Sequence, residues 1–511
     1  MVHRNSDLSN ILSSLNLGSS VAELDTLLET ARVETSTFTD LLADRVDLIP
    51  GTKGSGKSAL FRIFTDFLPE NLLRQSRVVV AHGVQAHGDP VFHAFTDQFE
   101  GLSELEFVSF WFIYLVSLAN EQFLKGLRYK KVLRGSEAEI KAFQSACAAA
   151  RIPEIEAKKS LKDILEWTLS VLSSWRPKVK FQPPGGVGEF ELDLFGNLRD
   201  SPNESNLATS DRPIPQYVNE IKQKLESILE KSGLSLWLMV DRLDEIFPRR
   251  SKVESKALRG ILRATQLFSS EKVRVKVFLR DDMLEQIVRG PEGFTALTHL
   301  TARQADTLRW DEDQILAMVT KRFFANETLT NYLQIDLDSL NASALYRKQA
   351  FGKIFPEKVF QSDNQSATIS WICKRCADGR GVFTPRDVLD LLIRAKQRQE
   401  DSYKADPDGS SSSIIGAQAI KYGFMELSKR KKETYLQAEF PHFWKHIEKF
   451  YGKKTIYDTT ALQALLGKDF KMMKENLLAI GFLSRGKKAG EDVFSIPFLY
   501  RHGMNLTRGK A

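Results

Sequence analysis

The residues with the clearest chemical potential form one run, Gly51 to Ser58, which reads Gly-Thr-Lys-Gly-Ser-Gly-Lys-Ser. In this GxxxxGK[ST] spacing, glycines let backbone N–H groups turn around a β-phosphate, the lysine reaches the β- and γ-phosphates, and the final hydroxyl binds Mg²⁺. The apolar run 46–49 before it and a helical pattern after it suit this role, because a helix start faces the anion. A Gly/Ser-rich surface turn is the alternative. We predict nucleotide binding by Gly51, Thr52, Lys53, Gly54, Ser55, Gly56, Lys57, Ser58 and Ala59, with Lys57 also catalytic and Ser58 a metal ligand.

An apolar run that ends in carboxylates supplies the other half of such a site. Residues 236–240 lead into Asp241-Arg-Leu-Asp244-Glu245. Asp241 is placed to bind Mg²⁺ directly or through water, while Asp244 and Glu245 can orient the water that attacks the γ-phosphate. Glu245 is the first candidate for the general base and Asp244 the second. The alternative is an acidic cluster that only caps or solvates the end of a strand.

Arg280 closes the next apolar run, 273–279, where a sensor of the γ-phosphate would lie. In P-loop ATPases with a catalytic glutamate, one strand is expected between the phosphate-loop strand and the acidic strand. We predict that 273–279 is this strand. The alternative for Arg280-Asp-Asp is a helix start with a solvated charge.

The elements that must position these residues alternate between strands and helices. Apolar runs predict strands at 46–49, 77–82, 236–240 and 273–279 and a further short strand at 308–310. This alternation implies a parallel sheet and an α/β fold. The predicted organisation is an N-terminal helical segment (1–40), a P-loop NTPase core (41–310) with a helical insertion at about 103–232, a helical lid (311–404), a linker (405–413) and a basic winged-helix-like domain (414–511).

Positive charge is concentrated at the C-terminal end. From Lys421 onward there are 18 Lys+Arg against 9 Asp+Glu. Of the totals of 72 Lys+Arg and 65 Asp+Glu, the first 420 residues therefore hold 54 and 56. A local excess of this kind is typical of a protein that binds a polyanion. Two strand-like runs, 482–485 and 492–496, would form a wing with Lys487 and Lys488 at its tip, and 468–478 would be the recognition helix. We therefore predict DNA binding; a solvated basic helix face at 429–432 is the alternative.

Together, Asp241 to Glu245, Arg280 and Phe383-Thr-Pro-Arg386 resemble AAA+ and STAND ATPases, including the NACHT type, the origin-recognition type and uncharacterised bacterial P-loop ATPases. The resemblance covers about residues 40–400. It implies ATP with Mg²⁺, a helical lid, Arg386 as a second sensor, a homo-oligomer with an arginine supplied in trans, and often a winged helix. The 184 residues from Lys57 to Asp241 exceed what a minimal core needs, so the insertion departs from the pattern. Candidates for the arginine in trans, without decisive context, are Arg249, Arg250, Arg259 and Arg263.

Other chemistry-bearing residues carry weaker signals. Cys373 and Cys376 spell CxxC without a second metal-binding pair, and His82, His87 and His93 have no motif spacing. A nuclease reading of Glu154, Glu156 and Lys158 is disfavoured because they lie in helical patterning. No LSGGQ-like or NKxD motif is present, which disfavours an ABC-type ATPase and a GTPase.

The leading hypothesis is an ATP-driven switch or motor that acts on DNA, in genome maintenance or anti-phage defence. The alternative is a signalling or scaffold switch whose C-terminal domain binds an effector protein. Three cysteines and no export signal predict a cytoplasmic location. No membrane association is expected, since the apolar run 107–119 is short for a bilayer and suits a buried core helix.

Overall fold

The computed structural model describes residues 3–83, 102–124, 128–150, 152, 214–245, 252–268, 270–289, 301–362, 365–488 and 490–511. It divides into two compact units. One comprises Met1–Ser36, Thr52–Ala59 and Leu308–Ala511, and the other comprises Thr37–Gly51 and Leu60–Thr307. We call them the lid unit and the sheet unit. The predicted lid, linker and basic domain all lie in the lid unit, while the predicted N-terminal segment is divided between the two.

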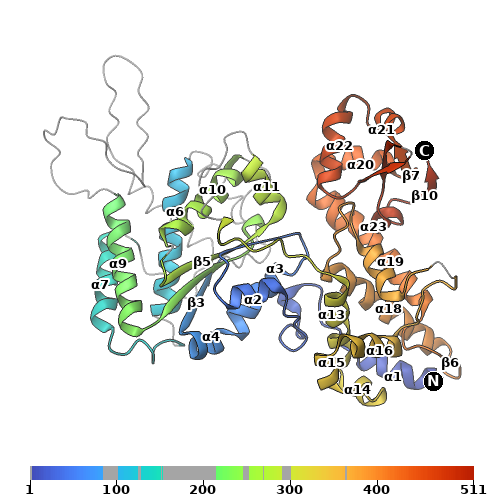
Figure 1. Ribbon diagram of the computed structural model, residues 1–511, viewed down its shortest axis with the longest axis horizontal. Coiled ribbons are helices and arrows are strands. Elements are labelled where there is room, and N and C mark those ends of the chain that lie inside the picture. Colours follow the sequence, from blue (N-terminus) through green and yellow to red (C-terminus); the bar gives the residue numbers. More distant parts are fainter. Residues whose placement is uncertain are drawn as a thin grey trace. The chain divides into compact units, whose positions relative to one another are not determined.

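Four parallel strands form the centre of the sheet unit (Figure 1). They are β2 (Leu48–Gly51), β3 (Val78–Gly83), β4 (Ser235–Val240) and β5 (Val273–Arg280), in the order β2-β5-β4-β3. The predicted α/β class with a parallel sheet is confirmed, and so is the prediction that 273–279 lies between the other two strands. Because all four strands run in one direction, their carboxyl ends meet at one edge of the sheet.

Alternate residues of these strands pack on opposite faces of the sheet, as the period of two requires. On one face, Phe64 packs against Phe38 and Trp237, and Phe61 packs against Phe278. The opposite face joins the apolar core that includes the helices of the insertion. The helices that surround the sheet are α2 (Ser36–Leu42), α3 (Lys57–Arg62) with a π turn (Ile63–Phe67), α4 (Pro69–Ser76), α6 (Glu104–Leu118), α7 (Glu137–Ala149), α9 (Ile214–Ser232), α10 (Lys252–Leu267) and α11 (Asp281–Arg289).

The apolar helix α6 is longer than the sequence suggested. A π turn, Ala119–Leu124, extends it to 21 residues, so Glu104–Leu124 is the one helix of the described chain that is long and apolar enough to cross a membrane. The prediction that the apolar run is too short was therefore wrong, whereas burial in the core is confirmed: 83% of the apolar window is buried. Trp111 Nε1 donates to the carbonyl of Ala257 at 2.8 Å, and Gly260 lets α10 approach Phe107.

The prediction of a strand at 308–310 is wrong. The backbone that pairs with the outer side of β2 comes a few residues earlier, through a parallel bridge between Leu48 and Gln304. Arg303 fixes this register, because its side chain contacts Asp47 at 2.5 Å and Asp44 at 3.1 Å. Ion pairs to residues that precede β2 thus decide which residues lie beside that strand.

Helices dominate the lid unit, where α18 packs along α19 and α1 packs on α18 (Figure 1). Gly423 permits the close approach of α19, since a Cβ there would lie 2.4 Å from the carbonyl oxygen of Leu391. The predicted linker includes β6 (Ser410–Ser411), which pairs with β1 (His3–Arg4). The remaining helices up to this point are α1 (Asn5–Ser14), η1 (Ala22–Leu24), α13 (Glu312–Phe324), α14 (Glu327–Tyr332), α15 (Leu337–Ala342), α16 (Ala344–Ile354), α17 (Thr368–Cys376) and α18 (Pro385–Ala405).

The C-terminal part of the lid unit adds a second small sheet, in the order β10-β7-β9-β8. β8 and β9 form an antiparallel hairpin in which Lys487 lies opposite Asp492 and Lys488 opposite Glu491. The elements follow the chain as α19 (Ala417–Lys431), η6 (Lys432–Gln437), α20 (Pro441–Ile447), η7 (Glu448–Phe450), β7 (Lys454–Asp458), α21 (Thr459–Leu466), η8 (Gly467–Asp469), α22 (Phe470–Ala479), β8 (Ser484–Lys488), β9 (Glu491–Ser495), α23 (Phe498–Arg501) and β10 (Thr507–Lys510).

Candidate nucleotide site

The loop predicted to hold phosphates starts directly after Gly51, the last residue of β2. Gly54 and Gly56 have φ of +87° and +100°, a region that glycine adopts readily and other residues rarely. Lys57 is the first residue of α3, and its Nζ donates to the carbonyl of Thr52 at 3.0 Å. The chain therefore makes a tight turn back over itself between the strand and the helix, as a phosphate-binding loop requires.

Two hydroxyls in this loop are buried without a hydrogen-bond partner among the residues that the structure describes. They are Oγ1 of Thr52 and Oγ of Ser55, whose residues are 5% and 2% exposed. A buried hydroxyl without a partner costs about 1–3 kcal/mol. The oxygen atoms of a bound ligand could accept hydrogen bonds from these two hydroxyls. A nucleotide, which the sequence predicts as the ligand, carries such oxygen atoms.

Within the lid unit, two other segments contact the loop. Trp310 Nε1 donates to the carbonyl of Ser55 at 2.7 Å. A Cβ at Gly54 would lie 3.2 Å from both Thr384 Oγ1 and Arg386 Cβ, so any larger residue there would crowd these neighbours. Sequence reasoning missed Trp310. The available signal was its position directly before Asp311, which begins α13 with a capping box.

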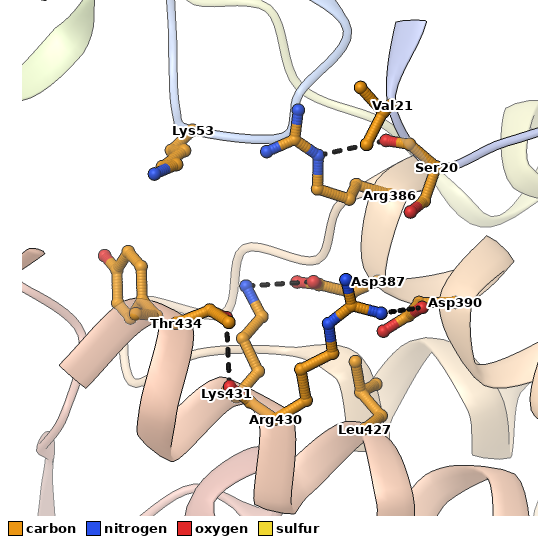
Figure 2. Close-up of a pocket in the computed structure, with 11 residues that line it drawn as sticks. Ser20, Val21, Lys53, Arg386, Asp387, Asp390, Leu427, Arg430, Lys431 and Thr434 are labelled. Carbon is orange, nitrogen blue, oxygen red and sulfur yellow. Dashed lines mark hydrogen bonds and ion pairs between the residues drawn. The ribbon is translucent and has the colours of Figure 1, made fainter. Parts of the chain in front are cut away.

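Arg386 lines an open pocket of about 160 Å³ that also includes Lys53 of the loop (Figure 2). Its Nε donates to the carbonyl of Ser20 at 3.1 Å. The opposite wall carries two ion pairs between α18 and α19, Lys431 with Asp387 at 2.9 Å and Arg430 with Asp390 at 3.1 Å. Arg386, which the resemblance implies as a second sensor, thus lies beside Lys53 and Gly54 of the phosphate loop.

Lys53 also forms an ion pair with Glu439, which is 386 residues further along the chain. The Glu439 side chain is 4% exposed and that of Lys53 is 33% exposed. A buried carboxylate needs a partner of this kind, because its desolvation is otherwise unfavourable. The pair ties the phosphate loop to the segment between η6 and α20.

At the carboxyl edge of the sheet, Arg280 joins two acidic side chains. Its guanidinium binds both carboxylate oxygens of Asp282, at 2.9 and 2.8 Å, and its Nη1 contacts Asp244 at 3.4 Å. Arg280 is 9% exposed. In the register of the sheet, Arg280 pairs with Gly51, the last residue of β2.

The backbone turns sharply directly after β4, where the acidic residues Asp241, Asp244 and Glu245 lie. Asp241 follows β4 and is 3% exposed, and Arg242 has φ of +60°, which is unfavourable for a residue with a side chain. Backbone outliers of this kind cluster at functional sites, so the turn supports a functional reading of this segment. Asp244 and Glu245 lie in η5 (Leu243–Glu245), but the side chain of Glu245 lies outside what the structure describes.

Several weaker candidates receive structural roles. Burial raises the pKa of Cys373 to about 12 and raises that of Cys376 well above the ordinary thiol value, which disfavours the thiolate that metal or redox chemistry needs. Arg259 and Arg263 contact Glu104 of α6, at 3.5 and 2.5 Å. The remaining named candidates lie outside the described residues: His87, His93, Glu154, Glu156, Lys158, Arg249 and Arg250.

Comparison with known proteins gives only distant structural similarity. No family model matches the chain, and no curated protein matches it. The ORC1 protein of Aeropyrum pernix, solved in complex with DNA, is 13% identical, with 95% of this chain and 96% of that chain covered and a TM-score of 0.36. A Walker-type ATPase of Pyrococcus abyssi is 11% identical, with 92% and 94% covered and a TM-score of 0.35.

Proposed function

We propose that this chain binds and hydrolyses ATP as an AAA+-like P-loop ATPase and couples its nucleotide state to DNA binding. One observation carries the proposal: a GxxxxGKS loop with two glycines at positive φ follows a parallel strand whose last residue pairs with Arg280. The strand order, with β5 between the phosphate-loop strand and the acidic strand, agrees with an ATPase that uses a catalytic glutamate.

Each candidate residue has a role in this proposal. When bound, ATP would supply the γ-phosphoryl group and Mg²⁺ would neutralise charge on its oxygens. Lys57 would bind the β- and γ-phosphates, and Ser58 and Asp241 would hold the metal. Arg280 would stabilise charge at the γ-phosphate, since Arg280 is the last residue of β5, the strand adjacent to β2.

The choice of general base follows from the contacts of Asp244. Its carboxylate contacts the Arg280 guanidinium at 3.4 Å, and Arg280 is held in turn by Asp282. This ion pair engages the Asp244 carboxylate with the guanidinium of Arg280 and so orients that guanidinium. We therefore keep Glu245 as the base and assign Asp244 the positioning of Arg280.

We further propose that residues 441–495 form a winged helix that binds DNA. The order helix, strand, two helices and hairpin supports this, with α22 as the recognition helix and β8 and β9 as the wing. Lys471 on α22 and Lys487 and Lys488 on the wing are exposed and available to phosphates. The pair between Lys53 and Glu439 gives the nucleotide loop a direct connection to the segment that precedes α20.

Steady-state ATP hydrolysis, with and without duplex DNA, tests the proposal. Lys57→Ala should abolish hydrolysis, and Glu245→Gln should bind ATP but hydrolyse it slowly. DNA-stimulated turnover that is lost in Lys57→Ala supports coupling to DNA. Turnover that is indifferent to DNA at low salt, where phosphate contacts are strongest, would instead favour a signalling or scaffold switch. A homo-oligomer, an effector protein and a cytoplasmic location stay predictions.

A further inference from the structure

Aromatic rings and cations form a row within the lid unit. The residues of this row lie between positions 360 and 501, far from the phosphate loop in the sequence. Lys421 Nζ lies 4.0 Å from the ring of Phe360, which lies 6.2 Å from the ring of Trp371. The Arg375 guanidinium lies 4.3 Å from Trp371 and 4.2 Å from Phe498. Arg501 lies 4.0 Å from Phe498. We call these six residues the ring–cation row: Lys421, Phe360, Trp371, Arg375, Phe498 and Arg501.

The row combines elements that are distant in sequence but packed together. α17 and α23 are in contact, and α19 lies beside α23 (Figure 1). Trp371 is 2% exposed and Phe424 of α19 packs against it at 5.7 Å, so the row has a rigid base. The central ring of the row, Trp371, is therefore held by the packing of the unit.

The cations of the row have no acidic partner among the residues that the structure describes. Arg375 and Lys421 contact only rings, and Arg501 adds one bond, from Nε to the carbonyl of Ile496 at 2.8 Å. Burial and the neighbouring Arg501 lower the pKa of Arg375 to about 10, while burial and Arg508 lower that of Arg501. Arg375 and Arg501 thus each lie near another cation, and an anionic ligand would relieve this repulsion.

The rings at the two ends of the row are open to solvent. Phe360 is 40% exposed and Phe498 is 39% exposed. On the adjoining surface of α19, Tyr422 is 41% exposed and Met425 is 38% exposed. Exposed rings beside cations without carboxylate partners are the combination that binds single-stranded nucleic acid, because bases stack on the rings while phosphates contact the cations.

We propose that the ring–cation row binds single-stranded nucleic acid, with bases on Phe360 and Phe498 and backbone phosphates on Lys421, Arg375 and Arg501. Its ligand differs from that of the proposed winged helix, whose lysines would contact the backbone of a duplex. The inference extends the proposed DNA association to a second surface and requires no ATP hydrolysis. Cation–ring contacts that only fasten α17 to α23 are the structural alternative.

The test is fluorescence anisotropy of the full chain with a labelled oligo-dT strand and with a labelled duplex, each over a range of salt concentrations. The double variant Phe360→Leu/Phe498→Leu keeps apolar contacts but removes the rings. We expect its affinity for oligo-dT to fall roughly ten-fold or more, since each stacked base contributes about 1–3 kcal/mol. Tyr332→Leu is the matched control, because Tyr332 is a 38% exposed ring of the same unit outside the row. This variant should bind normally.

A second readout separates binding from packing. Lys421→Gln and Arg501→Gln should each reduce the slope of log affinity against log salt for oligo-dT by about 0.7, the value for one phosphate contact on a single strand. Helix packing alone would leave this slope unchanged. The slope is measured on soluble protein with an unchanged melting temperature, and the two charge variants provide independent routes if the double ring variant does not fold.

The outcomes distinguish this inference from the proposed function. Weaker oligo-dT binding by the row variants, with duplex binding retained, supports the row. Normal oligo-dT binding and unchanged salt slopes in all row variants overturn it, even if Lys487→Gln/Lys488→Gln weakens duplex binding and so supports the winged helix. Conversely, a row that binds oligo-dT while the wing variant leaves duplex binding unchanged supports this inference and contradicts the proposed wing.

Discussion

The ion pair between Lys53 and Glu439 makes a quantitative prediction about how the phosphate loop is held. Lys53→Met should leave the Glu439 carboxylate, 4% exposed, without this partner. A hydrogen bond to a charged group contributes about 1.5–3 kcal/mol, and the lower half applies more closely because Lys53 is 33% exposed. Because each 1.4 kcal/mol is a factor of ten, the local opening equilibrium should rise roughly 10- to 40-fold.

Hydrogen exchange measured by mass spectrometry checks this prediction without assuming two-state unfolding of the whole chain. Peptides that cover 52–62 and 439–447 should exchange faster in Lys53→Met and in Glu439→Gln, and the double variant should show less than the sum of the two effects. Lys348→Met is the control, since its pair with Asp313 at 3.6 Å has side chains 59% and 65% exposed. Exposed pairs contribute about 0–1 kcal/mol. Equal, small changes in Lys53→Met and Lys348→Met would refute the reasoning.

Three further predictions concern the sheet unit. Lys276→Met should lower the free energy of unfolding by about 2–4 kcal/mol, as measured by urea denaturation, because Lys276 is fully buried beside Asp47 at 2.7 Å. Arg303 retains its own hydrogen bonds to Asp47 and so limits the loss. Arg280→Met should lower kcat for ATP about 100-fold or more with little change in ATP affinity; a changed affinity with normal kcat would contradict a transition-state role. Burial lowers the pKa of His82 below 6.5, so the folded state binds fewer protons than the unfolded state, and stability should fall as the pH drops through 6.5; the melting temperature of His82→Gln should change less between pH 7.5 and 5.5.

The strands and the loop were largely predictable because their signals are local. Continuous apolar runs predict buried parallel strands, and all four long runs became strands within about two residues of their predicted bounds. The glycines of the loop were equally readable, since Gly54 and Gly56 adopt a backbone conformation that other residues avoid. The prediction of a strand at 308–310 was wrong because three residues are too few to show a strand pattern. The segment beside β2 is instead held by the ion pairs of Arg303, which join residues distant in the sequence.

By itself, the sequence determined the α/β class, the position of the phosphate loop, and the residues that end β4 and β5. Each depends on neighbouring residues in the chain, whose types dictate local conformation and burial. Only the tertiary structure decided that Trp310 supports Ser55, that Lys53 binds Glu439, and that Arg375 of α17 contacts Phe498 of α23. Such contacts join segments separated by more than a hundred residues, and no local pattern specifies them, because they arise from packing of the whole unit.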